Sequence, residues 1–160
     1  MKEVGMLNGA IDSALTRQGH MDLMMVVDAG FPCPDEVELI DIALSEGVPS
    51  VLDVLAELKK FHSVEKVVMA TDTREHNPTY FDKVSRLFGV EVEVIPHTEL
   101  KVRSHGVKTI IRTGDFTAWG NVMLVSGAGA RWQMESSPLV VLNFVLFDVA
   151  IRGYGCTNSI

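Results

Sequence analysis

Short apolar runs alternate along the chain with segments whose apolar residues recur at helical spacing. Apolar runs with the length of buried strands lie at 21–27, 37–44, 64–71, 109–112 and 121–125. Residues 90–94 alternate strictly between valine and glutamate, which predicts a strand with one face in water. The pattern therefore predicts six strands, although for the run at 21–27 periodicity alone leaves a helix as the alternative.

The intervening segments carry the signals that begin and end helices. Predicted helices lie at 8–18, 49–61, 78–88 and 98–104. Asn8 is expected to cap the first helix and Gly19 to end it, and Pro49 suits the first turn of the second. Asn77 is expected to cap the third helix, which Gly89 would end.

Strands that alternate with helices predict an α/β fold with a largely parallel sheet flanked by helices. The 160 residues suffice for one domain, which we place at 1–132. After the small residues at 127–130 the pattern changes to a polar stretch and then an apolar run at 139–151 that cannot continue the sheet. Residues 133–160 are therefore predicted to be a C-terminal appendage that the domain does not need.

Composition narrows the classes of partner. Apolar residues make up 47% and the net charge is −7, so the chain lacks the basic surface that nucleic acids and anionic membranes require. The run at 139–151 has thirteen residues and includes Asn143 and Asp148, whereas a membrane span needs about 20 apolar residues. The first residues contain no apolar stretch of a secretory leader. Cys33 and Cys156 are far apart in the sequence, so free thiols are favoured over a disulfide. We therefore expect a soluble cytoplasmic protein.

The first candidates for chemistry flank the strand at 21–27. Asp28 ends this strand, and ligands of open α/β sheets bind beyond the carboxyl ends of the strands. His20 precedes the same strand, so the two side chains would meet only through strand curvature, a ligand or a neighbouring subunit. The residues alone favour another interpretation of His20, as a side chain that caps the end of the preceding helix.

Two later segments also place polar groups near strand ends. His97 follows the strand at 90–94 and is a candidate for ligand binding, although a purely structural role in a turn is the commoner explanation for such a histidine. The loop at 112–121 carries Trp119 and Asn121. Trp119 offers a flat face for a sugar ring, although a core position is the alternative. The remaining histidines are expected to be solvated; they are His62, His76 and His105. No pair of histidines has the spacing of metal ligands, and we predict neither a metal site nor a cofactor.

From about residue 5 to residue 127, the series of motifs resembles the D-ribose pyranase / L-fucose mutarotase family. The motifs that carry the resemblance are Leu7-Asn8, Gly19-His20-x-Asp22, Asp28-Ala29-Gly30-x-Pro32-x-Pro34, Ile40-Asp41-x-Ala43-Leu44-x-x-Gly47-Val48-Pro49-Ser50, His76-Asn77-Pro78, His97-x-x-x-Lys101, Ile111-Arg112-Thr113-Gly114 and Asn121-Val122-x-Leu124 with Gly127. No single motif is diagnostic, but the series in this order is specific.

The resemblance implies roles for particular residues. His20 matches the catalytic proton donor of the family. Sugar-binding positions implied in the same way are Asp28, His97, Lys101, Trp119, Gly120 and Asn121. Trp119 stands where the family usually has tyrosine, which keeps the aromatic face and removes the hydroxyl. The segment from Asp28 is similar to the ribose branch and Gly120 to the fucose branch, so both sugars stay open.

The implied activity is the opening and reclosure of a sugar ring. An imidazole with a pKa near 6.5 takes and gives protons at neutral pH, and a positioned acid–base group contributes about 10²–10⁴-fold. The leading hypothesis is an isomerase for the pyranose and furanose forms of D-ribose. The alternatives are an L-fucose mutarotase and a non-catalytic sugar-binding protein of a pentose uptake system. The resemblance also implies a homo-oligomer, a ring-shaped decamer with its sites between subunits.

Overall fold

A computed structural model describes residues 1–129 of the 160-residue chain. The predicted boundary after residue 132, the appendage at 133–160 and Cys156 lie outside the described residues. The domain boundary therefore stays a prediction.

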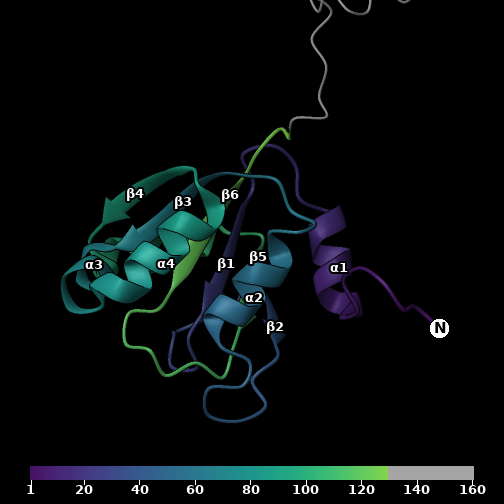
Figure 1. The fold of residues 1–160 in the computed structure, drawn as a ribbon, viewed down its shortest axis with the longest axis horizontal. Coiled ribbons are helices and arrows are strands. Elements are labelled where there is room, and N and C mark those ends of the chain that lie inside the picture. The colour runs from purple at the N-terminus through teal and green to yellow at the C-terminus, as the bar shows by residue number, and fades with distance from the viewer. Residues whose placement is uncertain (130–160) are drawn as a thin grey trace, which may run out of the picture. The chain divides into compact units, whose positions relative to one another are not determined.

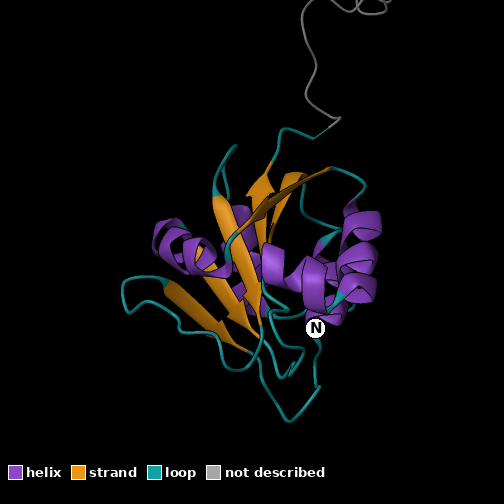
Figure 2. Ribbon diagram, turned by 90° about the vertical axis from the view of Figure 1, so that its left-hand side faces the viewer, coloured by secondary structure: helices purple, strands orange, loops and turns teal. Residues whose placement is uncertain are grey.

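The described part of the chain folds as a six-stranded sheet with helices on both faces (Figures 1 and 2). The strands are β1 (Leu23–Val27), β2 (Glu38–Asp41), β3 (Val64–Ala70), β4 (Glu91–Ile95), β5 (Thr109–Arg112) and β6 (Val122–Ser126). The helices are α1 (Gly9–Thr16), α2 (Val51–Leu58), α3 (Thr71–His76), α4 (Pro78–Phe88) and α5 (His97–Arg103), followed by the 3-10 turn η1 (Ser104–Gly106). The predicted α/β class is confirmed.

The strand order is β2-β5-β1-β6-β3-β4, with β1 and β6 in the middle of the sheet. The pairs β2–β5, β5–β1 and β3–β4 are parallel, whereas β6 is antiparallel to both of its neighbours. The prediction of a mostly parallel sheet is therefore confirmed, with β6 as the exception. The loop between β5 and β6 contains no helix, and a parallel return would need a longer crossover connection.

Two apolar cores cover the two faces of the sheet. Met24 and Val26 face one core, to which α1, α2 and α4 contribute, and Met25 and Val27 face the other, to which α5 contributes. These four residues of β1 are completely buried. Burial on both sides explains why the strand reads as an unbroken apolar run.

The ends of the first helices are fixed by local polar contacts. The Asn8 side chain accepts from the backbone amides of two residues in the first turn of α1, as predicted. The helix ends at Thr16, however, so the prediction that it ends at Gly19 is wrong. Pro49 follows a cis peptide bond and precedes α2, and Ser50 is the residue that caps this helix. The prediction of Pro49 in the first turn is therefore also wrong.

Several polar residues have roles that differ from the predicted ones. α3 was not foreseen, because its sequence carries no apolar stripe. The side chain of Asn77 does not cap α4; it donates from Nδ2 to the carbonyl oxygen of Ala118 at 2.7 Å. His62 is half-buried rather than solvated, and its Nε2 lies 3.1 Å from the Ser126 hydroxyl. Gly89 ends α4 in the left-handed conformation, as predicted.

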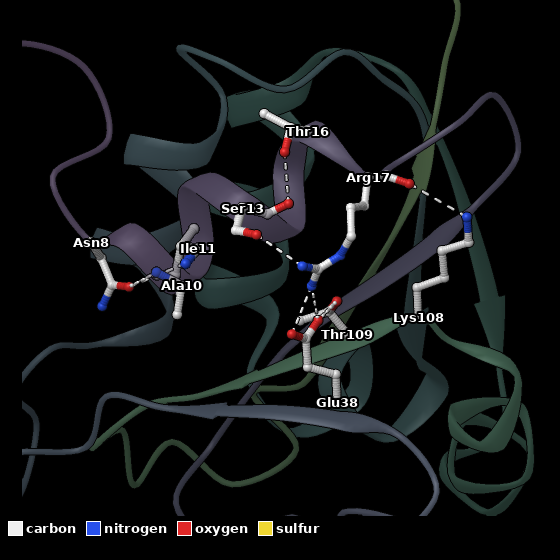
Figure 3. A network of polar contacts seen from close by, with 9 residues as sticks. All are labelled: Asn8, Ala10, Ile11, Ser13, Thr16, Arg17, Glu38, Lys108 and Thr109. Carbon is white, nitrogen blue, oxygen red and sulfur yellow. Dashed lines mark hydrogen bonds and ion pairs between the residues drawn. The ribbon is translucent and has the colours of Figure 1, made fainter.

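The C-terminal end of α1 is tied to the β2–β5 edge of the sheet (Figure 3). The guanidinium of Arg17 donates to both carboxylate oxygens of Glu38, and Glu38 also accepts from the hydroxyl of Thr109 at 2.9 Å. Lys108 Nζ lies 3.4 Å from the carbonyl oxygen of Arg17. The chain therefore leaves α1 from a fixed point just before His20.

Candidate functional site

Asp28 and Asn121 are joined by two hydrogen bonds at the carboxyl end of β1. The Asp28 backbone amide donates to Asn121 Oδ1 at 2.9 Å, and Asn121 Nδ2 donates to Asp28 Oδ2 at 2.8 Å. Asn121 is 1% exposed, whereas Asp28 is half-buried. The antiparallel course of β6 creates this pair, because it brings the start of β6 beside the end of β1. Two of the predicted site residues thus lie together.

The loop that leads to this pair is held by Asp115, a residue that the sequence analysis did not select. Its Oδ2 accepts from the amide of Val51 at the start of α2 at 2.8 Å, and its Oδ1 accepts from the amide of Thr117 at 2.7 Å. Its carbonyl oxygen accepts from the amide of Ala29. Asp115 is 6% exposed and therefore organises the loop rather than offering a free carboxylate. The only signal in the sequence was its place in a polar loop.

A cavity of about 280 Å³ opens beside Asp28. It is lined by Asp28, Ala29, Gly30, Asp115, Phe116, Thr117 and Ala118. Asp28 is the one predicted site residue in this lining, so the cavity lies to one side of the Asp28–Asn121 pair. Phe116 is 69% exposed and offers an apolar surface at the same place.

His97 begins α5, beyond the carboxyl end of β4. Its backbone amide donates to Asp72 Oδ2 at 3.2 Å, and its ring meets that of Phe31 edge to face, with centroids 6.4 Å apart. Burial, together with the positive charge of Lys101, lowers the pKa of His97. Nδ1 of His97 is buried and has no hydrogen-bond partner within residues 1–129. A neutral imidazole with an unused nitrogen suits a ligand hydroxyl.

Lys101 lies one helical turn after His97 and is exposed. Residues four apart on a helix share a face, so the two side chains project from one side of α5. Their roles in sugar binding stay a prediction.

Trp119 and Gly120 are held in a tight turn just before Asn121. Trp119 has a left-handed backbone, with φ of 55°, and its indole stacks on the ring of His76 with centroids 4.7 Å apart. The alternative that Trp119 belongs to the core is wrong, because its side chain is half-buried and lies against an exposed histidine. The carbonyl oxygen of Gly120 accepts from the buried hydroxyl of Tyr80 at 2.6 Å. The turn is therefore fixed from α3 and α4.

His20 lies at the opposite end of β1, in a turn that is also fixed. Its Nε2 is 3.0 Å from Glu65 Oε2 at the start of β3. Asp22 accepts from the amide of Gly19 at 2.5 Å and pairs with Lys108 at 2.5 Å, and both contacts lower the pKa of Asp22. The interpretation of His20 as a helix cap is wrong, since its ring pairs with Glu65 and α1 has already ended.

The chain alone does not bring His20 to the other candidates. The four steps from the first to the last of the five residues of β1, at about 3.3 Å each, separate its ends by about 13 Å. The strand is in register with β5 and β6 along its length, so no curvature closes this distance. Of the three possibilities left by the sequence, the ligand and a neighbouring subunit remain. The predicted sugar-binding residues lie beyond the carboxyl ends of the parallel strands, whereas His20 lies before the start of β1. These sugar-binding residues are Asp28, His97, Trp119, Gly120 and Asn121.

Within residues 1–129, no group of three or more histidine, cysteine, aspartate or glutamate side chains is arranged to hold a metal ion. No helix of this part of the chain is long and apolar enough to cross a membrane.

Comparison with known proteins gives consistent matches over the described part of the chain. Residues 1–129 match the model of the RbsD / FucU transport protein family. The chain is 41% identical over 128 residues to a D-ribose pyranase of Lactobacillus acidophilus, covering 79% of this chain and 98% of the relative. It is 42% identical over 135 residues to D-ribose pyranase 1 of Streptomyces griseus, covering 82% and 89%.

Solved structures give the same picture. The structure of Bacillus subtilis RbsD complexed with D-ribose matches with a TM-score of 0.78 and 36% identity, covering 81% of this chain and 99% of that one. The fucose mutarotase of Streptococcus pneumoniae in complex with L-fucose matches with a TM-score of 0.60 and 13% identity, covering 78% and 95%. This second match shows a shared fold alone.

Proposed function

We propose, from the premise that this chain belongs to the RbsD / FucU transport protein family, that it is an isomerase for the pyranose and furanose forms of D-ribose. The observation that carries the proposal is the similarity to D-ribose pyranases at 41–42% identity over nearly the whole described chain. The much lower identity to the fucose mutarotase, 13% against 36% for the ribose complex, favours D-ribose over L-fucose.

The sugar would bind beyond the carboxyl ends of the parallel strands. The proposed sugar-binding residues are Asp28, His97, Lys101, Trp119, Gly120 and Asn121. The Asp28–Asn121 pair supports this assignment, because it fixes a carboxylate and an amide beside a cavity of about 280 Å³. Sugar hydroxyls need both donors and acceptors, which these side chains and the unused Nδ1 of His97 supply.

The proposed reaction needs only proton transfers. The anomeric hydroxyl gives its proton to a base as the bond from C1 to the ring oxygen breaks, and the released ring oxygen is protonated. Reclosure through a different hydroxyl reverses these transfers and yields the other ring size. His20 would take and give the proton, since an imidazole does both near neutral pH.

Since His20 and Asp28 lie at opposite ends of β1, the proposed site combines His20 of one copy with the sugar-binding edge of another. The oligomer implied by the family resemblance supplies the second copy. In this arrangement neither surface alone catalyses ring exchange.

Saturation-transfer NMR on D-ribose measures pyranose–furanose exchange directly. We expect the wild-type chain to accelerate this exchange, and His20→Ala and Asp28→Ala each to lose it. Unfolding the two variants together and refolding them as mixed oligomers should restore about a quarter of the activity, because random pairing gives that share of sites with both residues intact. Binding without faster exchange in the wild type would favour a non-catalytic sugar-binding protein, and faster exchange of L-fucose alone would favour a mutarotase.

A further inference from the structure

β3 begins with an irregularity at Glu65. Val64 pairs with Ser126 and Lys66 pairs with Val125, so two steps along β3 correspond to one step along β6. Glu65 is the extra residue of this bulge. A bulge interrupts the alternation of side chains and turns the extra residue in a new direction, as is common beside active sites.

The chain after β6 braces the bulge from the other side. A Cβ atom on Gly127 would lie 2.7 Å from the Cβ of Glu65 and 3.0 Å from its backbone nitrogen, so only glycine permits this approach. The amide of Gly127 donates to the carbonyl oxygen of Ser63 at 2.8 Å. The backbone of Glu65 is therefore fixed although its side chain is partly in water.

The same stretch of chain fixes the turn that carries His20. The amide of Met21 donates to the carbonyl oxygen of Ser126 at 2.8 Å, and the amide of Ser126 donates to the carbonyl oxygen of Asp22 at 2.9 Å. Met21 has a left-handed backbone with φ of 68°, which turns the chain sharply after His20. Ser126 thus lies between the bulge and the turn and holds both.

These two fixed elements meet in one side-chain contact. Nε2 of His20 lies 3.0 Å from Oε2 of Glu65. An ionised carboxylate only accepts hydrogen bonds, so Nε2 must carry the proton of this bond. The other ring nitrogen, Nδ1, then keeps its lone pair when the imidazole is neutral.

We propose that Glu65 is a positioning residue for the ring-opening reaction, and this inference rests on the proposed function. The carboxylate of Glu65 holds the His20 ring by its Nε2 proton and so makes Nδ1 the nitrogen that reacts. Nδ1 takes the proton of the anomeric hydroxyl as C1 becomes a carbonyl and the bond to the ring oxygen breaks. It then returns the proton to that oxygen, so no other reagent is needed.

Two substitutions separate positioning from folding. Glu65→Ala removes the acceptor, whereas Glu65→Gln keeps an amide oxygen that still accepts from Nε2. We expect Glu65→Ala to lower kcat for D-ribose exchange about ten-fold with little change in KM, which is the lower end of the loss of about 10–100-fold seen when a metal-bound histidine loses its carboxylate partner. Glu65→Gln should keep most of the activity.

Glu36→Ala is the matched control, because Glu36 forms an exposed pair with Nδ1 of His105 at 2.6 Å and precedes β2, which is four strand positions from the β3 that carries Glu65. It should leave kcat unchanged. Ring ¹⁵N chemical shifts at pH 8 give a second measurement: His20 should carry its proton on Nε2 in the wild type and in Glu65→Gln, and should populate both tautomers in Glu65→Ala.

Wild-type activity in Glu65→Ala, or equal losses in Glu65→Ala and Glu65→Gln, would overturn the positioning role. A wild-type His20 protonated on Nδ1 would overturn it as well. A wild-type chain that does not accelerate exchange would instead overturn the proposed function, so the two failures are distinguishable.

Discussion

Replacing Asn121 by alanine tests how the sugar-binding edge is held together. The substitution removes both hydrogen bonds between Asn121 and Asp28 from a side chain that is 1% exposed. A neutral hydrogen bond contributes about 1 kcal/mol and one to a charged group about 1.5–3 kcal/mol. Because Asp28 is only half-buried, water recovers part of this loss, and we expect the free energy of unfolding to fall by about 2–3 kcal/mol.

Urea unfolding followed by circular dichroism measures this change, at one protein concentration because the stability of the proposed oligomer would depend on that concentration. The matching fall in Tm is about 4–12 °C. Asn77→Ala is the control, since its side chain makes one exposed bond to the Ala118 carbonyl and should cost less than about 1 kcal/mol. An Asn121→Ala variant no less stable than Asn77→Ala would refute the reasoning that the Asp28–Asn121 pair holds this edge.

Three further predictions concern other parts of the chain. Trp119→Ala should weaken D-ribose binding measured by calorimetry, whereas Trp119→Tyr should retain it; unchanged affinity in Trp119→Ala would remove this residue from the site. Burial lowers the pKa of His62 in the folded chain, so the unfolded chain binds a proton at His62 more readily as the pH falls below about 6.5. The free energy of unfolding should therefore fall with pH in this range, and His62→Gln should make it less dependent on pH in urea titrations. A chain cut after Trp132 should stay soluble and keep its ring-exchange rate, because the buried core residues of the described part of the chain lie between Met6 and Leu124. An insoluble product would contradict the predicted boundary.

The strands and their order of appearance were readable from the sequence because β1, β3 and β6 are mostly apolar, β4 alternates apolar and acidic residues, and β2 and β5 each carry an apolar pair. Local capping was readable only where a residue acts within its own turn, through its side chain at Asn8 and through its left-handed backbone at Gly89. The polar side chain of Asn77 instead bonds to a loop 41 residues away, and no local signal reveals such a partner. α3 was missed for a related reason, since it is held by contacts with the site loop rather than by an apolar stripe of its own, as the bond from Thr73 to the Trp119 carbonyl shows.

The candidate site was predictable residue by residue but not as an arrangement. His20 and Asp28 were found through their motifs, whereas Glu65 and Asp115 carry no local signature. Glu65 bonds to a histidine 45 residues earlier, and Asp115 to an amide 64 residues earlier. The bulge that aims Glu65 depends on the register between β3 and β6, which an apolar pattern does not specify within one residue.

The separation of His20 from Asp28 has a physical consequence for the proposed enzyme. β1 is buried on both faces and bonded along both edges, so it acts as a rigid spacer between the two. A change inside one copy cannot bring them together without breaking the centre of the sheet. In the proposed arrangement, the distance between the His20 ring and the sugar is therefore set by how two copies pack. His20 and the sugar-binding residues must each be held rigidly within their own copy, because movement of either would change this distance further. The bulge at Glu65 in β3 braces His20 before the start of β1, and the Asp28–Asn121 pair braces the end of β1.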